Sequence, residues 1–280
     1  MAELNDMNGW LVVSDIDGTL NNKIRQTPKN NIRAIDDFVR RGGIFTLASG
    51  RNVQSLKKHY DKLPIGNMPA IVMNGSGIYD FSSNQYLYKD TICQKGMEAV
   101  RAAHLRFPHT EIAIFTSDNI YCVNGGICCS VFVTADHLRH QFCKSFEEVP
   151  LEDWCKVIFF ALPSKLRKIM TFIHQHGGDA VKTFHSSVIG FEIVNGTANK
   201  GAAVLKLAEM KGIPLDHTAA IGDYYNDVDM LKAVGISAAC GQAPKKIKAL
   251  VKYQACHCNQ GAVADFIQYI VNLQKQSKER

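Results

Sequence analysis

With 280 residues the chain is long enough for one large domain or two, and its hydrophobic fraction of 46 % argues against disorder. The formal charge of +6 comes from 32 basic and 26 acidic residues without a long basic run, which argues against nucleic acid and suits an anionic small molecule. Residues 1–9 have no cationic start, and the first apolar run is too short for a signal peptide or a membrane span. We therefore expect a cytoplasmic protein without a membrane partner; a monomer is compatible with the sequence.

The cysteine content argues against a disulfide framework. Nine cysteines is an odd number, and they are scattered along the chain, which is typical of reduced thiols in a cytosolic protein. Cys256 and Cys258 flank His257. This cluster is either a soft-metal site or a set of ordinary thiols, and the absence of zinc-like spacing favours the thiols.

The first 80 residues alternate apolar runs with helical patterns. Leu11–Val13 predicts a short buried strand, and Pro28, with Thr27 as N-cap, predicts a helix start. Further strands are predicted over 44–48 and 70–73, with a helix over 53–60. Strand–helix–strand units of this length favour a parallel sheet with right-handed crossovers.

The pattern changes near Asp80 and returns after Thr197. Between them the sequence predicts an α+β insert, with helices over 93–107 and 164–176, a hairpin over 111–115 and 120–123, and strands over 156–162, 181–184 and 190–194. The later α/β part should contain helices over 200–211, 228–234 and 244–251, strands over 218–221 and 236–239, and a last helix, 262–273, packed on the sheet. We expect a Rossmann-like parallel-sheet core, residues 1–81 and 193–280, split by an inserted domain, 82–192.

Two aspartates follow the first strand. Residues two apart in a strand face the same side, so Asp15 and Asp17 should project together from its carboxyl end, where ligands bind in open α/β sheets. Two adjacent carboxylates repel unless a cation or a shared proton relieves them, and Mg²⁺ suits such a pair. A simple Asp-rich turn is the alternative. An EF-hand loop fits poorly, because Gly18 is fourth and Gln26 is twelfth in the segment.

Further polar groups stand at predicted strand ends or helix starts, and together they carry a resemblance. They are Ser49 with Gly50, Lys200, and Asp223 with Asn226 and Asp227. The segments DIDGTL, LASGR, NKG and GDYYNDVDML resemble the four motifs of the haloacid dehalogenase-like hydrolases. Their order and the place of the insert resemble the Cof-type subfamily with a C2B cap, as do Asn74–Gly75 and Asn259–Gly261.

The resemblance implies a Mg²⁺-dependent phosphatase of small phosphorylated metabolites, with sugar phosphates first. It makes Asp15 the nucleophile that forms an aspartyl-phosphate and Asp17 the general acid–base. Asp15, the backbone carbonyl of Asp17 and Asp223 would bind Mg²⁺, and Asp227 would reach the ion through water. The residues implied to bind phosphate are Ile16, Ser49, Gly50, Lys200 and Asn226.

Several assignments stay open. Arg51 either contacts substrate or forms a structural ion pair, and Tyr224 and Tyr225, where the family often has Ser at the first position, either shape the pocket rim or simply pack. The insert should act as a lid, with possible contacts among His104, Asp118, His137 and His185. Two other functions remain: a phosphomutase on the same scaffold, and a non-catalytic sensor of phosphorylated metabolites.

Overall fold

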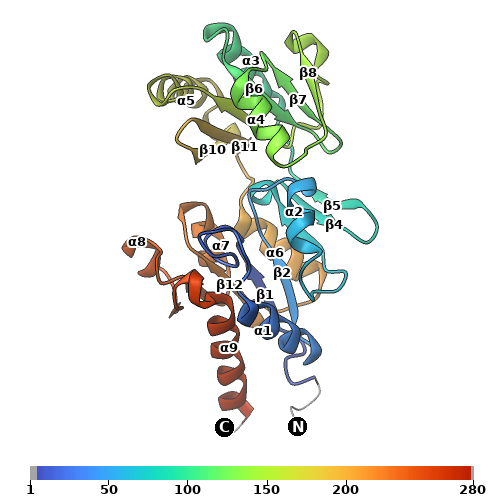
Figure 1. Ribbon diagram of the computed structural model, residues 1–280, viewed down its shortest axis with the longest axis vertical. Helices are drawn as coiled ribbons and strands as arrows, with labels where there is room; N and C mark the ends of the chain where they lie inside the picture. Colours follow the sequence, from blue (N-terminus) through green and yellow to red (C-terminus); the bar gives the residue numbers. More distant parts are fainter. Residues whose placement is uncertain (1–4, 279–280) are drawn as a thin grey trace. The chain divides into compact units, whose positions relative to one another are not determined.

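The computed structural model describes residues 5–278, which form two compact units. One unit combines the described residues up to Tyr88 with those from Asn199 onward, and the other is the continuous stretch Lys89–Ala198. Figure 1 traces the chain through both by colour. The chain therefore leaves the first unit once and returns to it once.

The first unit is built on a five-stranded parallel sheet in the order β14-β13-β12-β1-β2. Its strands are β1 (Leu11–Ser14), β2 (Ile44–Leu47), β12 (Thr218–Gly222), β13 (Ile236–Ala239) and β14 (Tyr253–Gln254). Leu11 of β1 lies opposite Ile44 on one side and Thr218 on the other. The apolar run Leu11–Val13 is fully buried, as a strand covered on both faces requires.

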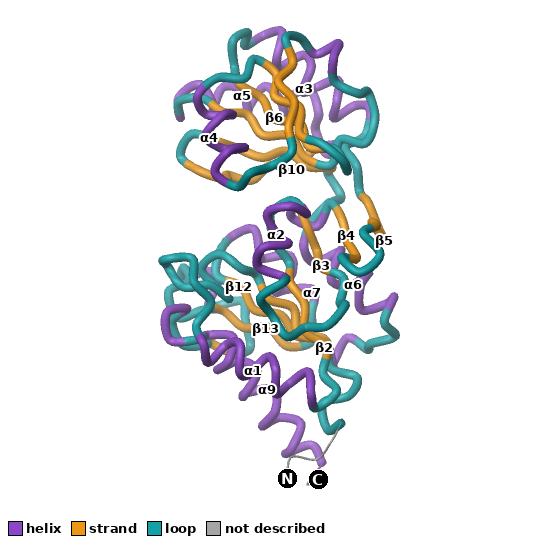
Figure 2. The backbone as a smooth tube through the Cα atoms, turned by 45° about the vertical axis from the view of Figure 1, so that its right-hand side comes forward, coloured by secondary structure: helices purple, strands orange, loops and turns teal. Residues whose placement is uncertain are grey.

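Helices cover this sheet. They are α1 (Lys29–Arg40), α2 (Val53–Tyr60), α6 (Lys200–Met210), α7 (Val228–Ala233), α8 (Lys245–Lys248) and α9 (Ala262–Lys278). Leu11 and Val13 share a core cluster with Val204 of α6 and Met230 of α7. The first and last of these helices, α1 and α9, lie side by side (Figure 2), and the amide N–H of Ala264 donates to the side chain of Asn31 at 2.9 Å.

The third predicted strand of the parallel sheet behaves differently. Strand β3 (Ala70–Val72) touches the main sheet through one parallel bridge, Ala48 with Ile71, and pairs in a separate antiparallel sheet. That sheet has the order β3-β4-β5, with β4 (Gly77–Asp80) and β5 (Gln85–Lys89). The chain reverses at residues 73–75, where Met73, Asn74 and Gly75 all have positive φ. This tight reversal replaces the helical crossover that a further parallel strand would need.

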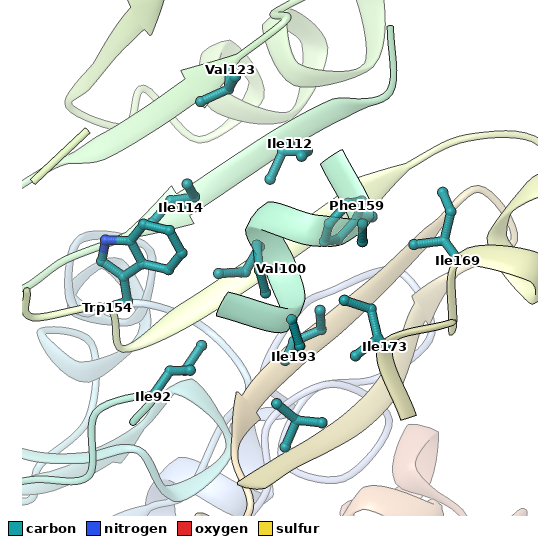
Figure 3. Packing of buried hydrophobic residues seen from close by; sticks show 14 of the residues in the cluster. Ile92, Val100, Ile112, Ile114, Val123, Trp154, Phe159, Ile169, Ile173 and Ile193 are labelled. Atoms are coloured by element: carbon teal, nitrogen blue, oxygen red, sulfur yellow. The ribbon is translucent and has the colours of Figure 1, made fainter. Parts of the chain in front are cut away.

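The second unit is a six-stranded sheet in the order β10-β11-β9-β6-β7-β8 with three helices. Its elements are α3 (Gln94–Arg106), β6 (Glu111–Phe115), β7 (Ile120–Val123), α4 (Ile127–Ala135), β8 (His140–Cys143), β9 (Lys156–Phe160), α5 (Pro163–Gly177), β10 (Val181–Ser187) and β11 (Gly190–Asn195). Figure 3 shows Val100 of α3 and Ile173 of α5 in one buried cluster with Ile112 of β6 and the fully buried Trp154. The predicted fold class, a parallel-sheet α/β core with an inserted α+β domain, is confirmed.

Several local predictions need correction. Thr27 does not cap α1: its hydroxyl donates to Asn21 Oδ1 at 2.6 Å, and Pro28 occupies the cap position without a side-chain hydrogen bond. The helix predicted over 244–251 is reduced to Lys245–Lys248. Helix α4 has no counterpart among the predicted elements. Within residues 5–278, every helix is too short or too polar to cross a bilayer.

Candidate active site

Asp15 stands at the carboxyl end of β1, directly after Ser14. Its amide N–H donates to the carbonyl of Ile221 in β12 at 3.0 Å, so backbone pairing fixes the residue beyond the last strand position. The residue is only 6 % exposed. Its carboxylate is therefore held in a shielded position at the edge of the sheet where the sequence predicts a ligand.

Lys200 is the counter-charge of this carboxylate. It is the first residue of α6, whose start is capped by Asn199 through a 2.7 Å bond from the amide of Ala202. The side chain is fully buried, and its Nζ lies 2.6 Å from Asp15 Oδ1 and 2.7 Å from Asp227 Oδ1. One ammonium thus joins two of the predicted site carboxylates.

Asp223 lies close to both of these carboxylates. Asp15, Asp223 and Asp227 each offer an oxygen within 4.8 Å of the others, and within residues 5–278 no other group of three His, Cys, Asp or Glu side chains does so. Thr19 Oγ1 lies 3.4 Å from Asp223 Oδ1, and a Cβ on Gly18 would lie 2.5 Å from Asp223 Oδ2. Gly18 has φ +87°, so a glycine is needed here both for conformation and for space.

The carboxylate of Asp227 supports its neighbours directly. Besides Oδ1 on Lys200, its Oδ2 accepts from the backbone N–H groups of Asp223 at 2.9 Å and Tyr224 at 3.1 Å. Asp227 is fully buried. The side chain fastens the turn that carries Asp223 and sets the place of Lys200, while its predicted contact with an ion through water stays a prediction.

The charges of the cluster formed by Asp15, Asp223, Asp227 and Lys200 favour the binding of a further cation. Burial raises the pKa of the Asp15 carboxyl, and Asp227 and Asp223 raise it further, although Lys200 acts in the opposite sense. Burial, followed by the charge of Asp227, raises the pKa of Asp223 to about 6. The same two carboxylates, Asp15 and Asp227, raise the pKa of Lys200 against its burial. Three carboxylates face one ammonium, so a proton or a metal ion is favoured here.

These residues fit Mg²⁺. The ion takes oxygen ligands, normally one or two carboxylates together with water and substrate phosphate. Asp15 and Asp223 offer two carboxylates whose oxygens lie within 4.8 Å of each other. The donor set contains no thiol or imidazole, which argues against a softer metal.

Asp17 binds a different partner from Asp15. Strand β1 ends at Ser14, so the strand alternation on which the predicted joint projection depends does not extend to these positions. The carboxylate instead receives two bonds from Arg51, from Nε at 2.8 Å and from Nη2 at 2.8 Å. Burial would raise the pKa of Asp17, but the hydrogen bonds and charge of Arg51, with the charges of His59 and Arg25, lower it.

Three of the five residues predicted to bind phosphate gather around Asn74, whose amide N–H donates to the carbonyl of Ser49 at 2.9 Å. Ser49 is 2 % exposed, a Cβ on Gly50 would lie 3.1 Å from the side chain of Asn74, and Asn226 Nδ2 lies 3.4 Å from Asn74 Oδ1. Ile16 is fully buried, and its carbonyl accepts from Thr19 and Asn21 in the turn after β1. The structure thus brings Ser49, Gly50 and Asn226 together through Asn74.

Gln242 is a site residue that sequence reasoning missed. Its Nε2 donates to the carbonyl of Gly18 at 2.5 Å, its Oε1 accepts from the amide of Cys258 at 3.1 Å, and its nearby amide acts to lower the pKa of Asp223. It follows β13, a parallel strand whose carboxyl end meets the site. That position is the signal that could have found it.

The remaining candidates take no part in this cluster. Cys258 Sγ lies 3.6 Å from His257 Nδ1, but the segment 256–258 does not assemble three ligand atoms. Tyr224 and Tyr225 are more than half exposed and contact each other edge to face. In the second unit His104 stacks on Phe146 with ring centroids 4.6 Å apart, which is a packing role. Among the described residues, Asp118, His137 and His185 belong to no group of three ligand side chains.

A sequence model of the haloacid dehalogenase-like hydrolase family matches residues 12–267. The chain belongs to this family. Phosphatase YwpJ of Bacillus subtilis is 25 % identical over 288 residues, covering 93 % of this chain and 99 % of that protein. A haloacid dehalogenase-like hydrolase from Bacteroides thetaiotaomicron has a similar structure, with a TM-score of 0.83, 22 % identity and coverage of 93 % and 99 %. The structure of the subclass IIB sugar phosphatase BT4131 is also similar, with a TM-score of 0.78 and 20 % identity over 93 % of this chain and 98 % of that chain.

The predicted resemblance is thereby confirmed. The match covers both halves of the first unit and the whole of the second. The protein is a phosphatase of the haloacid dehalogenase-like family with the fold of subclass IIB.

Proposed function

We propose that this phosphatase depends on Mg²⁺ and hydrolyses small phosphorylated metabolites through an aspartyl-phosphate on Asp15. The observation that carries the proposal is the contact of Asp15 with Lys200 beside Asp223. A buried nucleophilic carboxylate, a fixed cation and a second carboxylate are the groups that phosphoryl transfer needs, because its catalysis consists mainly of positioning and charge stabilisation.

Asp15 and Asp223, with the backbone carbonyl of Asp17, would hold Mg²⁺, and Asp227 would support the site behind them. When bound, the ion supplies charge to draw a phosphoryl oxygen and the nucleophile together. Lys200 meanwhile binds Oδ1 of Asp15, so we assign Oδ2 to the attack. Ser49, Gly50 and Asn226, with the Ile16 backbone, are proposed to orient the remaining phosphoryl oxygens.

The reaction has two steps. In the first, Asp15 Oδ2 bonds to phosphorus while the bond to the leaving oxygen breaks, and the carboxyl proton of Asp17 passes to that oxygen. In the second, water attacks phosphorus, its proton returns to Asp17, and the bond to Asp15 breaks, releasing phosphate. General acid–base help of this kind is worth about 10²–10⁴-fold in rate.

We infer that the inserted domain selects the leaving group and excludes water. We propose residues 82–192, the range expected from the sequence, as the limits of this domain. Sugar phosphates are the first substrate class to test, since a structural relative is described as a sugar phosphatase. A screen of phosphorylated sugars, nucleotides and cofactors by phosphate release identifies the substrate.

The nucleophile is tested with Asp15→Asn and with a chelator, each assayed on 4-nitrophenyl phosphate. Both should abolish turnover. Asp36→Asn is the control, because Asp36 forms a surface pair with Arg40 away from the cluster. Unimpaired turnover in Asp15→Asn would refute the assignment. Isomerised hexose phosphate in place of free phosphate would indicate a phosphomutase, and no metal-dependent turnover would indicate a sensor.

A further inference from the structure

Arg51 binds Asp17 at two points. Nε reaches Oδ2 and Nη2 reaches Oδ1, both at 2.8 Å, which is the planar fork that guanidinium forms with a carboxylate. Two hydrogen bonds to one carboxylate restrict its position and also its rotation about the bond that attaches it to the side chain. The fork therefore fixes where the carboxylate of Asp17 points.

A third contact fixes Arg51 itself. Its Nη1 donates to Ser55 Oγ at 2.9 Å, and Ser55 lies in the first turn of α2, with its amide bonded to the N-cap side chain of Asn52 at 2.9 Å. The side chain of Arg51 is 17 % exposed. A rigid helix start thus holds the arginine, which in turn holds the aspartate.

Stability alone does not account for this arrangement. The side chain of Asp17 is 48 % exposed, and ion pairs with a well-solvated partner add little to folding because water already satisfies the charge. Asp17 also sits in a turn after β1 rather than inside a strand or helix, so its direction is not set by regular secondary structure. The contact therefore constrains orientation more than it stabilises the fold.

We propose that Arg51 is the positioning residue of the general acid–base Asp17. This inference rests on the proposed function, since it takes Asp17 as the group that protonates the leaving oxygen. When one carboxylate oxygen of Asp17 carries the proton, the other still accepts from Arg51, so one contact of the fork holds the side chain before the transfer. Both contacts hold it once the proton has moved to the leaving oxygen and the phosphorus–oxygen bond has broken.

Two aryl phosphates that differ in the basicity of their leaving group test the proposal. Phenyl phosphate releases phenol, whose pKa of about 10 equals that of tyrosine, so its oxygen needs a proton as it leaves. 4-Nitrophenyl phosphate releases a stable anion and needs little acid catalysis. The quantity to measure is kcat/KM, because it reports only the steps up to departure of the leaving group.

Arg51→Ala should lower kcat/KM about tenfold or more for phenyl phosphate and less than about threefold for 4-nitrophenyl phosphate. Arg51→Lys should resemble Arg51→Ala, because an ammonium keeps the charge but loses the fork. Arg41→Ala is the matched control: the Arg41 side chain is 12 % exposed and forks onto Asp6, which is not a site residue, so its loss should leave the ratio of the two substrates unchanged.

Equal losses for both substrates in Arg51→Ala, or full rescue by Arg51→Lys, would overturn the positioning role. If Arg51→Ala does not fold, Ser55→Ala decides the question: it removes the Nη1 contact while keeping the fork on Asp17, and it should shift the same ratio in the same direction by a smaller factor. Asp15→Asn is assayed in parallel. Turnover in that variant would refute the proposed function itself, so the two failures are distinguishable.

Discussion

The ammonium of Lys200 lies 2.6 Å from Oδ1 of Asp15, although the two residues are 185 positions apart in the sequence. This contact joins the turn after β1 to the start of α6, and both partners are shielded from water. The two halves of the first unit therefore meet at the site through one buried ion pair. Changes to this pair, or to the groups around it, should alter both stability and activity.

Removing the ammonium of Lys200 leaves the buried carboxylates of Asp15 and Asp227 without a counter-charge. Lys200→Met should lower turnover about a hundredfold or more, since a fixed charge at the reacting group is lost. It should also lower the free energy of unfolding at neutral pH by about 3–5 kcal/mol, because Asp15 and Asp227 stay buried. Denaturant unfolding measures the second effect. Lys206→Met, which removes an exposed pair with Glu209, should change neither quantity.

Mg²⁺ should stabilise the protein more at high pH than at low pH. The folded-state pKa values of Asp15 and Asp223, the latter about 6, exceed those of the unfolded chain, near 3.8. Their proton-linked stabilisation is therefore complete below about pH 3.8 and is lost as the pH rises through 6 and beyond. An ion that replaces those protons compensates for this loss. Melting temperatures with Mg²⁺ and with chelator, at about pH 5.5 and about pH 8, test this; an equal increment at both would contradict it.

Gln242 should tune the metal site without being a ligand. Gln242→Ala removes its bond to Gly18, which lies against the carboxylate of Asp223, so we expect Mg²⁺ affinity to fall about tenfold to a hundredfold, as for other groups that orient metal ligands. Titration calorimetry measures this. Gln268→Ala, which removes a surface bond to Asn272, serves as the control. Undiminished affinity in Gln242→Ala would mean that Asp223 is oriented by other groups.

Gly18→Ala should separate a spatial conflict from backbone strain. The new Cβ would lie 2.5 Å from Asp223 Oδ2, so Asp223 must move and Mg²⁺ binding should be lost. Gly66 also has positive φ, +61°, but a Cβ there would have nothing within 4 Å. Gly66→Ala should therefore lower the melting temperature slightly and leave Mg²⁺ binding intact. Retained binding in Gly18→Ala would show that the turn adapts.

Residues at strand ends were the most predictable part of the site. Asp15, Lys200 and Asp223 follow apolar runs or begin a patterned helix, and parallel strands carry such residues to one edge of the sheet. The direction of Asp17 was not predictable, because it depends on where β1 stops and on the reach of Arg51 from another strand end. The sequence allowed two roles for Arg51, a structural ion pair or a contact with substrate. In the structure Arg51 forms an ion pair with Asp17.

Elements without a polar–apolar period were the least predictable. Helix α4, ICCSVFVTA, contains no charged residue and is rich in β-branched and cysteine side chains, so it carries no helical signal. Tertiary packing decides its conformation: the ring of Phe132 contacts those of Phe115 and Phe160. The role of Thr27 was not predictable for a similar reason. Its hydroxyl hydrogen-bonds the side chain of Asn21 instead of capping the helix that follows.

The position of β1 between β2 and β12 also sets an order for synthesis. Strand β12 begins at Thr218, so one edge of β1 has no partner on the ribosome until that segment has emerged. The stretch Lys89–Ala198 is continuous and has all six of its strands before that point. We expect the nascent chain to compact in its middle first, while the exposed edge of β1 depends on chaperones or on speed to avoid intermolecular pairing.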